Sequence, residues 1–164
     1  MIGRILERFC LGLRVVIGIL MMALAIPVAA QVLARYTGII PVYLWTEELA
    51  TFIFVWVVMI GSMIAVWDGT HFNVEVLPEA RSPLGALLQK GFVLVLLIFF
   101  GGFFAWHGIE YTKIGSIQNS VMMRANMGLT HISVPLAGLG WAVFASYRLA
   151  EAVRVYRTAR GVTS

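Results

Sequence analysis

The sequence predicts an all-α integral membrane protein, and three observations support that class. Of the 164 residues, 60% are hydrophobic and 12% are charged, with a mean hydropathy of +0.90, whereas a soluble domain carries about a quarter charged residues. Four apolar runs are long enough to cross a hydrocarbon core of about 30 Å, which needs about 20 residues of helix. Backbone groups in lipid must be hydrogen-bonded within their own segment, so these runs are expected to be helices. We therefore expect a single four-helix membrane domain over residues 1–164.

The first transmembrane helix is expected at about residues 15–34, with a kink at Pro27. Arginines precede this run and the letters PVAAQ lie near its end, a combination also found in secretory signal peptides. The apolar stretch of a signal peptide has about 7–15 residues. Because the run here is longer, we interpret it as a retained membrane span.

Residues 1–14 predict an amphipathic arm that lies in the membrane interface. Their apolar side chains recur at helical spacing, while the charged ones occupy other positions on the helical wheel. Arg4 and Arg8 are candidate anchors to lipid headgroups. The apolar stripe consists of Ile2, Ile5, Leu6, Phe9, Cys10 and Leu13.

The second transmembrane helix is expected at about residues 49–67, with Thr46 as its N-cap. Trp45 and Trp67 bracket it at a helical separation of about 33 Å, which matches two interfacial aromatic belts. Trp56 lies midway, where it is expected either to face lipid or to pack against another helix.

The third transmembrane helix is expected at about residues 87–109, begun earlier by Ser82 as N-cap and Pro83 at the first helical position. An apolar stripe with helical spacing follows it in residues 114–125. This stripe predicts a second interfacial amphipathic helix, or a helix packed on another subunit outside the membrane.

The fourth transmembrane helix is expected at about residues 132–150, opening near Pro135, with Arg148 able to extend from its inner end to the interface. If both termini are cytoplasmic, nine of the 12 Lys and Arg residues lie on the cytoplasmic side. The positive-inside rule therefore predicts that both termini are cytoplasmic.

Two adjacent carboxylates, Glu47 and Glu48, stand at the mouth of the second helix. A helix N-terminus stabilises a carboxylate, so either residue alone is explained as a solvated helix start. Helical projection places Glu47 in line with Gly61 and Ala65, small residues that let another helix approach closely. Our hypothesis is that Glu47 points toward a protein neighbour, whereas Glu48 faces lipid headgroups or Arg35.

Several classes of site and function are disfavoured by what the sequence lacks. The expected spans 15–34 and 49–67 contain no ionisable residue, whereas a proton- or ion-coupled carrier places such groups near the midplane. Haem ligation needs two histidines at matching depth and well inside the bundle, but His71 lies on the inner side and His107 and His131 lie near the outer edge, which disfavours it. No enzyme motif appears, so we expect no catalytic residue, metal, cofactor or nucleic-acid partner.

One series of residues resembles a known family of transporter subunits. The series is Arg35-Tyr36, then Trp45-x-Glu47-Glu48, then Gly61 with Ala65, then Gly69-x-His71. It resembles the small, Q-type (DctQ-like) membrane subunit of tripartite ATP-independent periplasmic (TRAP) transporters, most clearly over residues 31–80.

The resemblance implies partners and a location that the residues alone do not give. Such a subunit lies in the bacterial inner membrane and pairs with a large multi-spanning subunit that moves sodium and substrate. A periplasmic binding protein delivers an organic acid to their outer face. The small subunit is expected to brace the large one, with Arg35, Trp45, Glu47 and Glu48 at the periplasmic end and His71 at the cytoplasmic end.

Two alternatives remain at this stage. A self-sufficient small carrier acting as a dimer predicts a midplane carboxylate and transport by this chain alone. A haem-bearing membrane anchor predicts a coloured protein with a Soret absorbance.

Overall fold

The computed structural model describes residues 2–37, 43–69 and 83–161, and these residues are almost entirely helical. The elements are α1 (Ile2–Thr37), α2 (Leu44–Asp68), α3 (Pro83–Ile117), the short α4 (Gly128–His131) and α5 (Ser133–Gly161). Four segments are long and apolar enough to cross a membrane, the last combining α4 with α5. The predictions of an all-α class and of four helices able to cross a membrane are therefore confirmed.

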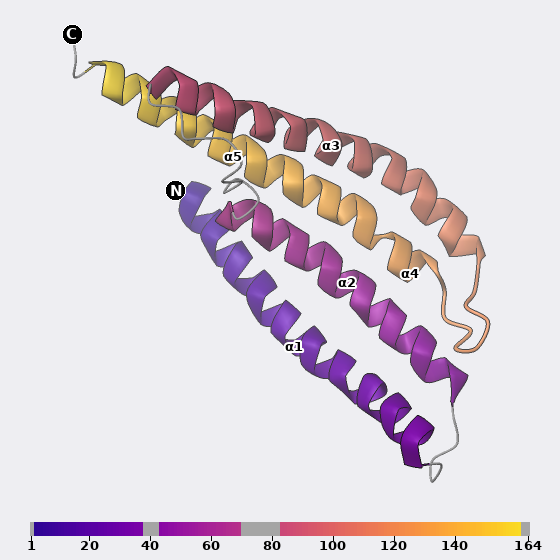
Figure 1. Ribbon diagram of the computed structural model, residues 1–164. Coiled ribbons are helices and arrows are strands. Elements are labelled where there is room, and N and C mark those ends of the chain that lie inside the picture. Colours follow the sequence, from indigo (N-terminus) through magenta and orange to yellow (C-terminus); the bar gives the residue numbers. More distant parts are fainter. Residues whose placement is uncertain (1, 38–42, 70–82, 162–164) are drawn as a thin grey trace.

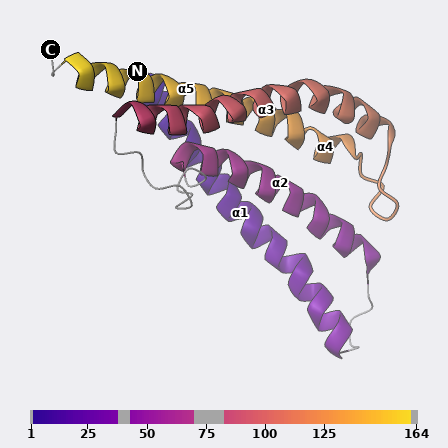
Figure 2. The same cartoon turned by 45° about the horizontal axis from the view of Figure 1, so that its top comes forward.

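The long helices lie side by side in one row, in the order α1, α2, α5, α3 (Figure 1). The row curls at the N-terminal end of α1, so that α1 also contacts α5. The Phe9 ring of α1 lies 6.2 Å from the Phe144 ring of α5. Toward the other end α1 and α2 spread away from α3 (Figure 2). Among the described helices, none packs on the outer sides of α1 and α3.

The core lies where α2, α5 and α3 meet. Its buried side chains are Ile60, Met63, Val66, Leu94, Ala137, Phe144 and Ala145. The α3 and α5 backbones approach closely at two glycines: a Cβ at Gly101 would lie 2.8 Å from the Gly138 carbonyl oxygen, and one at Gly138 would lie 2.7 Å from the Gly101 oxygen. Small residues allow such close helix packing without any polar contact.

The small-residue face of α2 packs within the chain itself. A Cβ at Gly61 would lie 3.3 Å from Cδ1 of Ile17 on α1. Among the described residues, the helix against Gly61 is α1, which runs antiparallel along α2 (Figure 1). A further contact of this face with a partner protein stays a prediction.

Several helix boundaries differ from the sequence expectations. Residues 2–14 continue directly into the first span, and Pro27 lies inside the unbroken helix α1. Pro83 is the first residue of α3, as predicted, while Ser82 lies outside the described residues.

The start of α2 also differs from its prediction. The helix begins at Leu44, its N-cap residue is Tyr43, and no side chain caps it. Thr46 is already helical, and its hydroxyl donates to the Tyr43 carbonyl at 2.7 Å. The predicted N-cap role of Thr46 is therefore wrong, because the helix gains one further turn before the carboxylates.

No helix covers the whole of the stripe predicted between the third and fourth spans. Helix α3 extends to Ile117, and residues 118–127, here called the α3–α4 loop, then reverse the chain. The Ser120 amide donates to the Ala125 carbonyl at 2.8 Å and the Met127 amide to the Gln118 carbonyl at 3.0 Å. The amphipathic helix expected over 114–125 is corrected to a helix end followed by a hydrogen-bonded loop.

Candidate functional site

The charged and polar groups of α2 gather at its two ends. Glu47 and Glu48 lie in its first turns, and Asp68 is its last residue. The intervening helix is apolar apart from hydroxyl and indole groups. Each end contacts a different part of the chain, so the two ends are described in turn.

The carboxylate of Glu48 is surrounded by donors of the α3–α4 loop. The Ser120 hydroxyl donates to Oε2 at 2.5 Å and the Met123 amide to Oε2 at 2.9 Å. The Met122 amide lies 3.1 Å from both carboxylate oxygens. We call Glu48, Ser120, Met122 and Met123 the Glu48 cluster.

The Glu48 cluster corrects the expectation that this residue faces headgroups or Arg35. The backbone N–H groups of a turned loop lack the carbonyl acceptors that a helix or strand would supply. A carboxylate can accept hydrogen bonds from several of these N–H groups at once. Glu48 thus joins the start of α2 to a loop more than 70 residues later in the chain. It is a structural residue and more than a helix start.

The α3–α4 loop is fixed at further points as well. The Asn126 side chain donates to the Ser116 carbonyl at 2.8 Å and accepts from the Gly128 amide at 2.7 Å. Arg124 adopts a positive φ of 52°, which is uncommon for a residue with a side chain. The loop nevertheless exposes the apolar side chains of Val121 at 80% and Met122 at 49% of full exposure, and Ile117 at the end of α3 is 85% exposed.

Glu47 has a different environment from its neighbour. Its side chain is exposed, and within the described residues it forms no ion pair with Arg35. It lines a cavity of about 320 Å³ between the start of α2 and the α3–α4 loop, together with Phe52, Met127 and Thr130. The buried Thr130 hydroxyl has no hydrogen-bond partner. Trp45 is also exposed, with its ring 6.3 Å from that of Tyr43.

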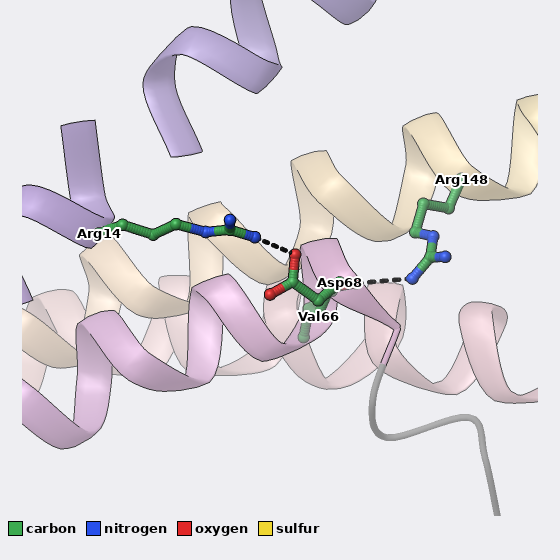
Figure 3. A network of polar contacts seen from close by, with 4 residues as sticks. All are labelled: Arg14, Val66, Asp68 and Arg148. Atoms are coloured by element: carbon green, nitrogen blue, oxygen red, sulfur yellow. Dashed lines mark hydrogen bonds and ion pairs between the residues drawn. The ribbon is translucent and has the colours of Figure 1, made fainter. Parts of the chain in front are cut away.

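The opposite end of α2 is held by arginines from two other helices (Figure 3). Nη2 of Arg14 on α1 lies 2.5 Å from Oδ1 of Asp68, and Nη1 of Arg148 on α5 donates to the Val66 carbonyl at 3.2 Å. We call Arg14, Val66, Asp68 and Arg148 the Asp68 cluster. Here Arg148, expected to extend toward the interface, binds one of the last carbonyls of α2, which helix ends leave without intrahelical partners.

Gly69 completes the Asp68 end. Its φ is 73°, and its amide donates to the Ala65 carbonyl at 3.0 Å, so it ends α2 in the left-handed conformation. The Arg148 guanidinium occupies the space where a Cβ would stand. Glycine is required on both grounds. His71 lies outside the described residues.

Two tryptophans connect α2 to the helices beside it. The Trp141 indole N–H donates to the Ser62 hydroxyl at 3.0 Å, and the Trp56 indole N–H donates to the Leu129 carbonyl at 3.2 Å. Of the two roles expected for Trp56, facing lipid or packing against another helix, the hydrogen bond to Leu129 of α4 favours packing. In a membrane such indole hydrogen bonds help hold neighbouring helices together.

Comparison with known proteins identifies the family. No curated protein matches the chain. A family model for the DctQ component of tripartite ATP-independent periplasmic transporters matches residues 24–155, which include Arg35, the Glu48 cluster and three of the four residues of the Asp68 cluster. The chain therefore belongs to the DctQ family and is a small permease subunit of a TRAP transporter.

Proposed function

We propose that this chain is the non-catalytic small subunit of a sodium-coupled TRAP transporter for organic acids in the bacterial inner membrane. It braces the large transport subunit and contributes the Glu48 end of α2 to the surface on which a periplasmic binding protein docks. Membership of the DctQ family supports the transporter and its three-component organisation.

The observation that carries the bracing role is the open row of helices. In a self-contained four-helix bundle each helix packs along two others, whereas among the described helices α1 packs mainly on α2 and α3 mainly on α5, so these two form the edges of the row. Both edges are strongly apolar: α1 exposes Val15, Ile19, Met22, Ile26 and Leu33, and α3 exposes Phe92, Phe99, Phe103 and Trp106. An open apolar row with no ionisable side chain in its middle suits a scaffold between lipid and a larger membrane protein, and does not suit a path for ions.

The docking role is supported by the rigidity of the α3–α4 loop. The positive-inside rule places this loop on the periplasmic side, with both termini in the cytoplasm. Glu48 fixes its shape before any partner arrives, while Val121 and Met122 stay exposed. A preorganised surface lowers the entropic cost of binding, so a loop held in this way suits a docking contact.

A co-purification experiment tests the proposed function. The tagged full chain is extracted from its native membrane in a mild detergent, and the proteins that accompany it are identified by mass spectrometry. We expect a much larger multi-spanning membrane protein, and we expect the pair to take up an organic acid into vesicles only with a sodium gradient and a periplasmic binding protein. A lone chain would contradict the bracing role, and uptake by the chain alone would favour a self-sufficient carrier.

A further inference from the structure

A second cavity, of about 380 Å³, lies between the first turns of α1 and the last turn of α2. Its α1 wall carries three guanidinium groups, those of Arg4, Arg8 and Arg14, and one carboxylate, that of Glu7. Trp67 lines it from α2. With Arg14 paired to Asp68, Arg4 and Arg8 still outweigh Glu7, and this excess of positive charge around one concave site points to an anionic ligand.

The arginines retain donors for such a ligand. Arg14 uses Nη2 for Asp68, but its side chain remains 50% exposed. Arg4 and Arg8 are exposed, and neither forms an ion pair with a described residue. The planar guanidinium fork matches the oxygens of a phosphate, so two arginines one helical turn apart can hold a single phosphate between them.

The depth of the cavity indicates a lipid as the source of the phosphate. The cavity lies where the charged first turns of α1 give way to the apolar run that begins at Val15. Leu11, which lines it, and Val15 are exposed at 62% and 59%, so an apolar surface continues from the cavity along α1. Trp67 beside it is typical of the headgroup level of a bilayer.

We propose that this cavity binds the phosphodiester of an anionic phospholipid, such as phosphatidylglycerol, with the acyl chains lying along α1. Arg4 and Arg8 hold the phosphate, Leu11 and Trp67 contact the glycerol and the first acyl carbons, and Arg14 remains on Asp68. A zwitterionic lipid carries the same phosphate with a cationic group beside it, which the arginines disfavour. The site does not depend on the large subunit.

The test uses the purified full chain in detergent micelles and native mass spectrometry. Phosphatidylglycerol and phosphatidylcholine with the same acyl chains are titrated separately. We expect phosphatidylglycerol to bind about tenfold more tightly, and the double variant R4Q/R8Q to weaken its binding by about tenfold to thirtyfold, since each basic residue near an anionic lipid contributes at this scale. The variant R4K/R8K, which keeps charge but loses the fork, should bind with intermediate affinity.

The matched control is R154Q/R157Q, which removes two exposed arginines from α5 near the same end of the row. It should leave phosphatidylglycerol binding within about twofold, because these residues do not line the cavity. An equal loss in both double variants, or equal affinity for the two lipids, would overturn the site in favour of general attraction. Displacement of the lipid by millimolar inorganic phosphate would show a phosphate site without a lipid role and would also overturn the proposal.

Discussion

Each end of α2 carries a carboxylate near the edge of the membrane span, and the two carboxylates are bound by different kinds of partner. At the first end, Glu48 accepts hydrogen bonds from uncharged donors of one loop. At the last end, Asp68 pairs with a cation from α1 while Arg148 of α5 binds the neighbouring backbone. The first arrangement shapes a surface, and the second connects three helices. We therefore assign the proposed docking role to the Glu48 end and a stabilising role to the Asp68 end.

Among the variants that test this difference, removal of the Glu48 carboxylate should have the largest effect, and the effect is on hydrogen exchange in the α3–α4 loop. In E48A the Met122 amide loses its acceptor and the Met123 amide keeps only the Ser120 hydroxyl oxygen. We expect the Met122 amide to exchange with solvent about a hundredfold faster and the Met123 amide by a smaller factor, because hydrogen bonds to a charged acceptor are among the stronger ones. The measurement is hydrogen–deuterium exchange of the α3–α4 loop. Unchanged exchange in that loop would show that Glu48 does not fix it.

Replacing Gly69 tests whether the Asp68 end of α2 needs a residue without a side chain. G69A must place a Cβ at φ 73° and against the Arg148 guanidinium, so we expect a loss of about 1–2 kcal/mol in the free energy of unfolding. Thermal unfolding in detergent measures it. The control is G102A, where nothing lies within 4 Å of an added Cβ, and a helical alanine there should stabilise the chain by about 0.5–1 kcal/mol. A neutral G69A would refute the close fit with Arg148.

The ion pair itself should contribute less than the backbone around it. Arg14 and Asp68 are 50% and 35% exposed, so solvent screens the pair and D68N should cost no more than about 1 kcal/mol. The cost should shrink in high salt. The charge-reversed double variant R14D/D68R should recover part of the loss, and equal destabilisation at low and high salt would contradict a screened pair.

Glu47 should show the smallest effect on stability. E47Q changes an exposed side chain that accepts no hydrogen bond from the α3–α4 loop among the described contacts. We expect unfolding and loop exchange to match those of the unaltered chain. A loosened loop in E47Q would mean that the adjacent carboxylates act together and would remove the distinction between them.

The fold follows from the sequence where the signal is local. The apolar runs predict α1, α2, α3 and α5, and the αL glycine at Gly69 ends α2 where Asp68 suggests an end. The role of Glu48 depends on backbone amides of residues 122 and 123, which any sequence carries. No residue type at those positions indicates this contact, so projection along one helix cannot find it. The predicted contact of Glu47 with a protein neighbour stays a prediction.

The sequence also does not show which helix packs against a small-residue face. Gly61 indicates close packing, but it does not say whether α1 or another protein supplies the neighbour. The prediction of a helix over residues 114–125 is wrong in its second half. The apolar residues there have helical spacing, but the hydrogen bonds made by Asn126 and Glu48 favour a turned chain. Contacts between distant segments outweigh local periodicity at both places.

The most direct test of the docking account is uptake as a function of binding-protein concentration. The chain and its large partner are reconstituted together in vesicles under a sodium gradient, with E48A compared against E47Q. We predict that E48A raises the binding-protein concentration for half-maximal uptake by about tenfold, while its co-purification with the large subunit is unchanged, because a loosened loop must be ordered on docking. An unchanged half-maximal concentration in E48A, with the loop shown to be loosened by hydrogen exchange, would contradict the account.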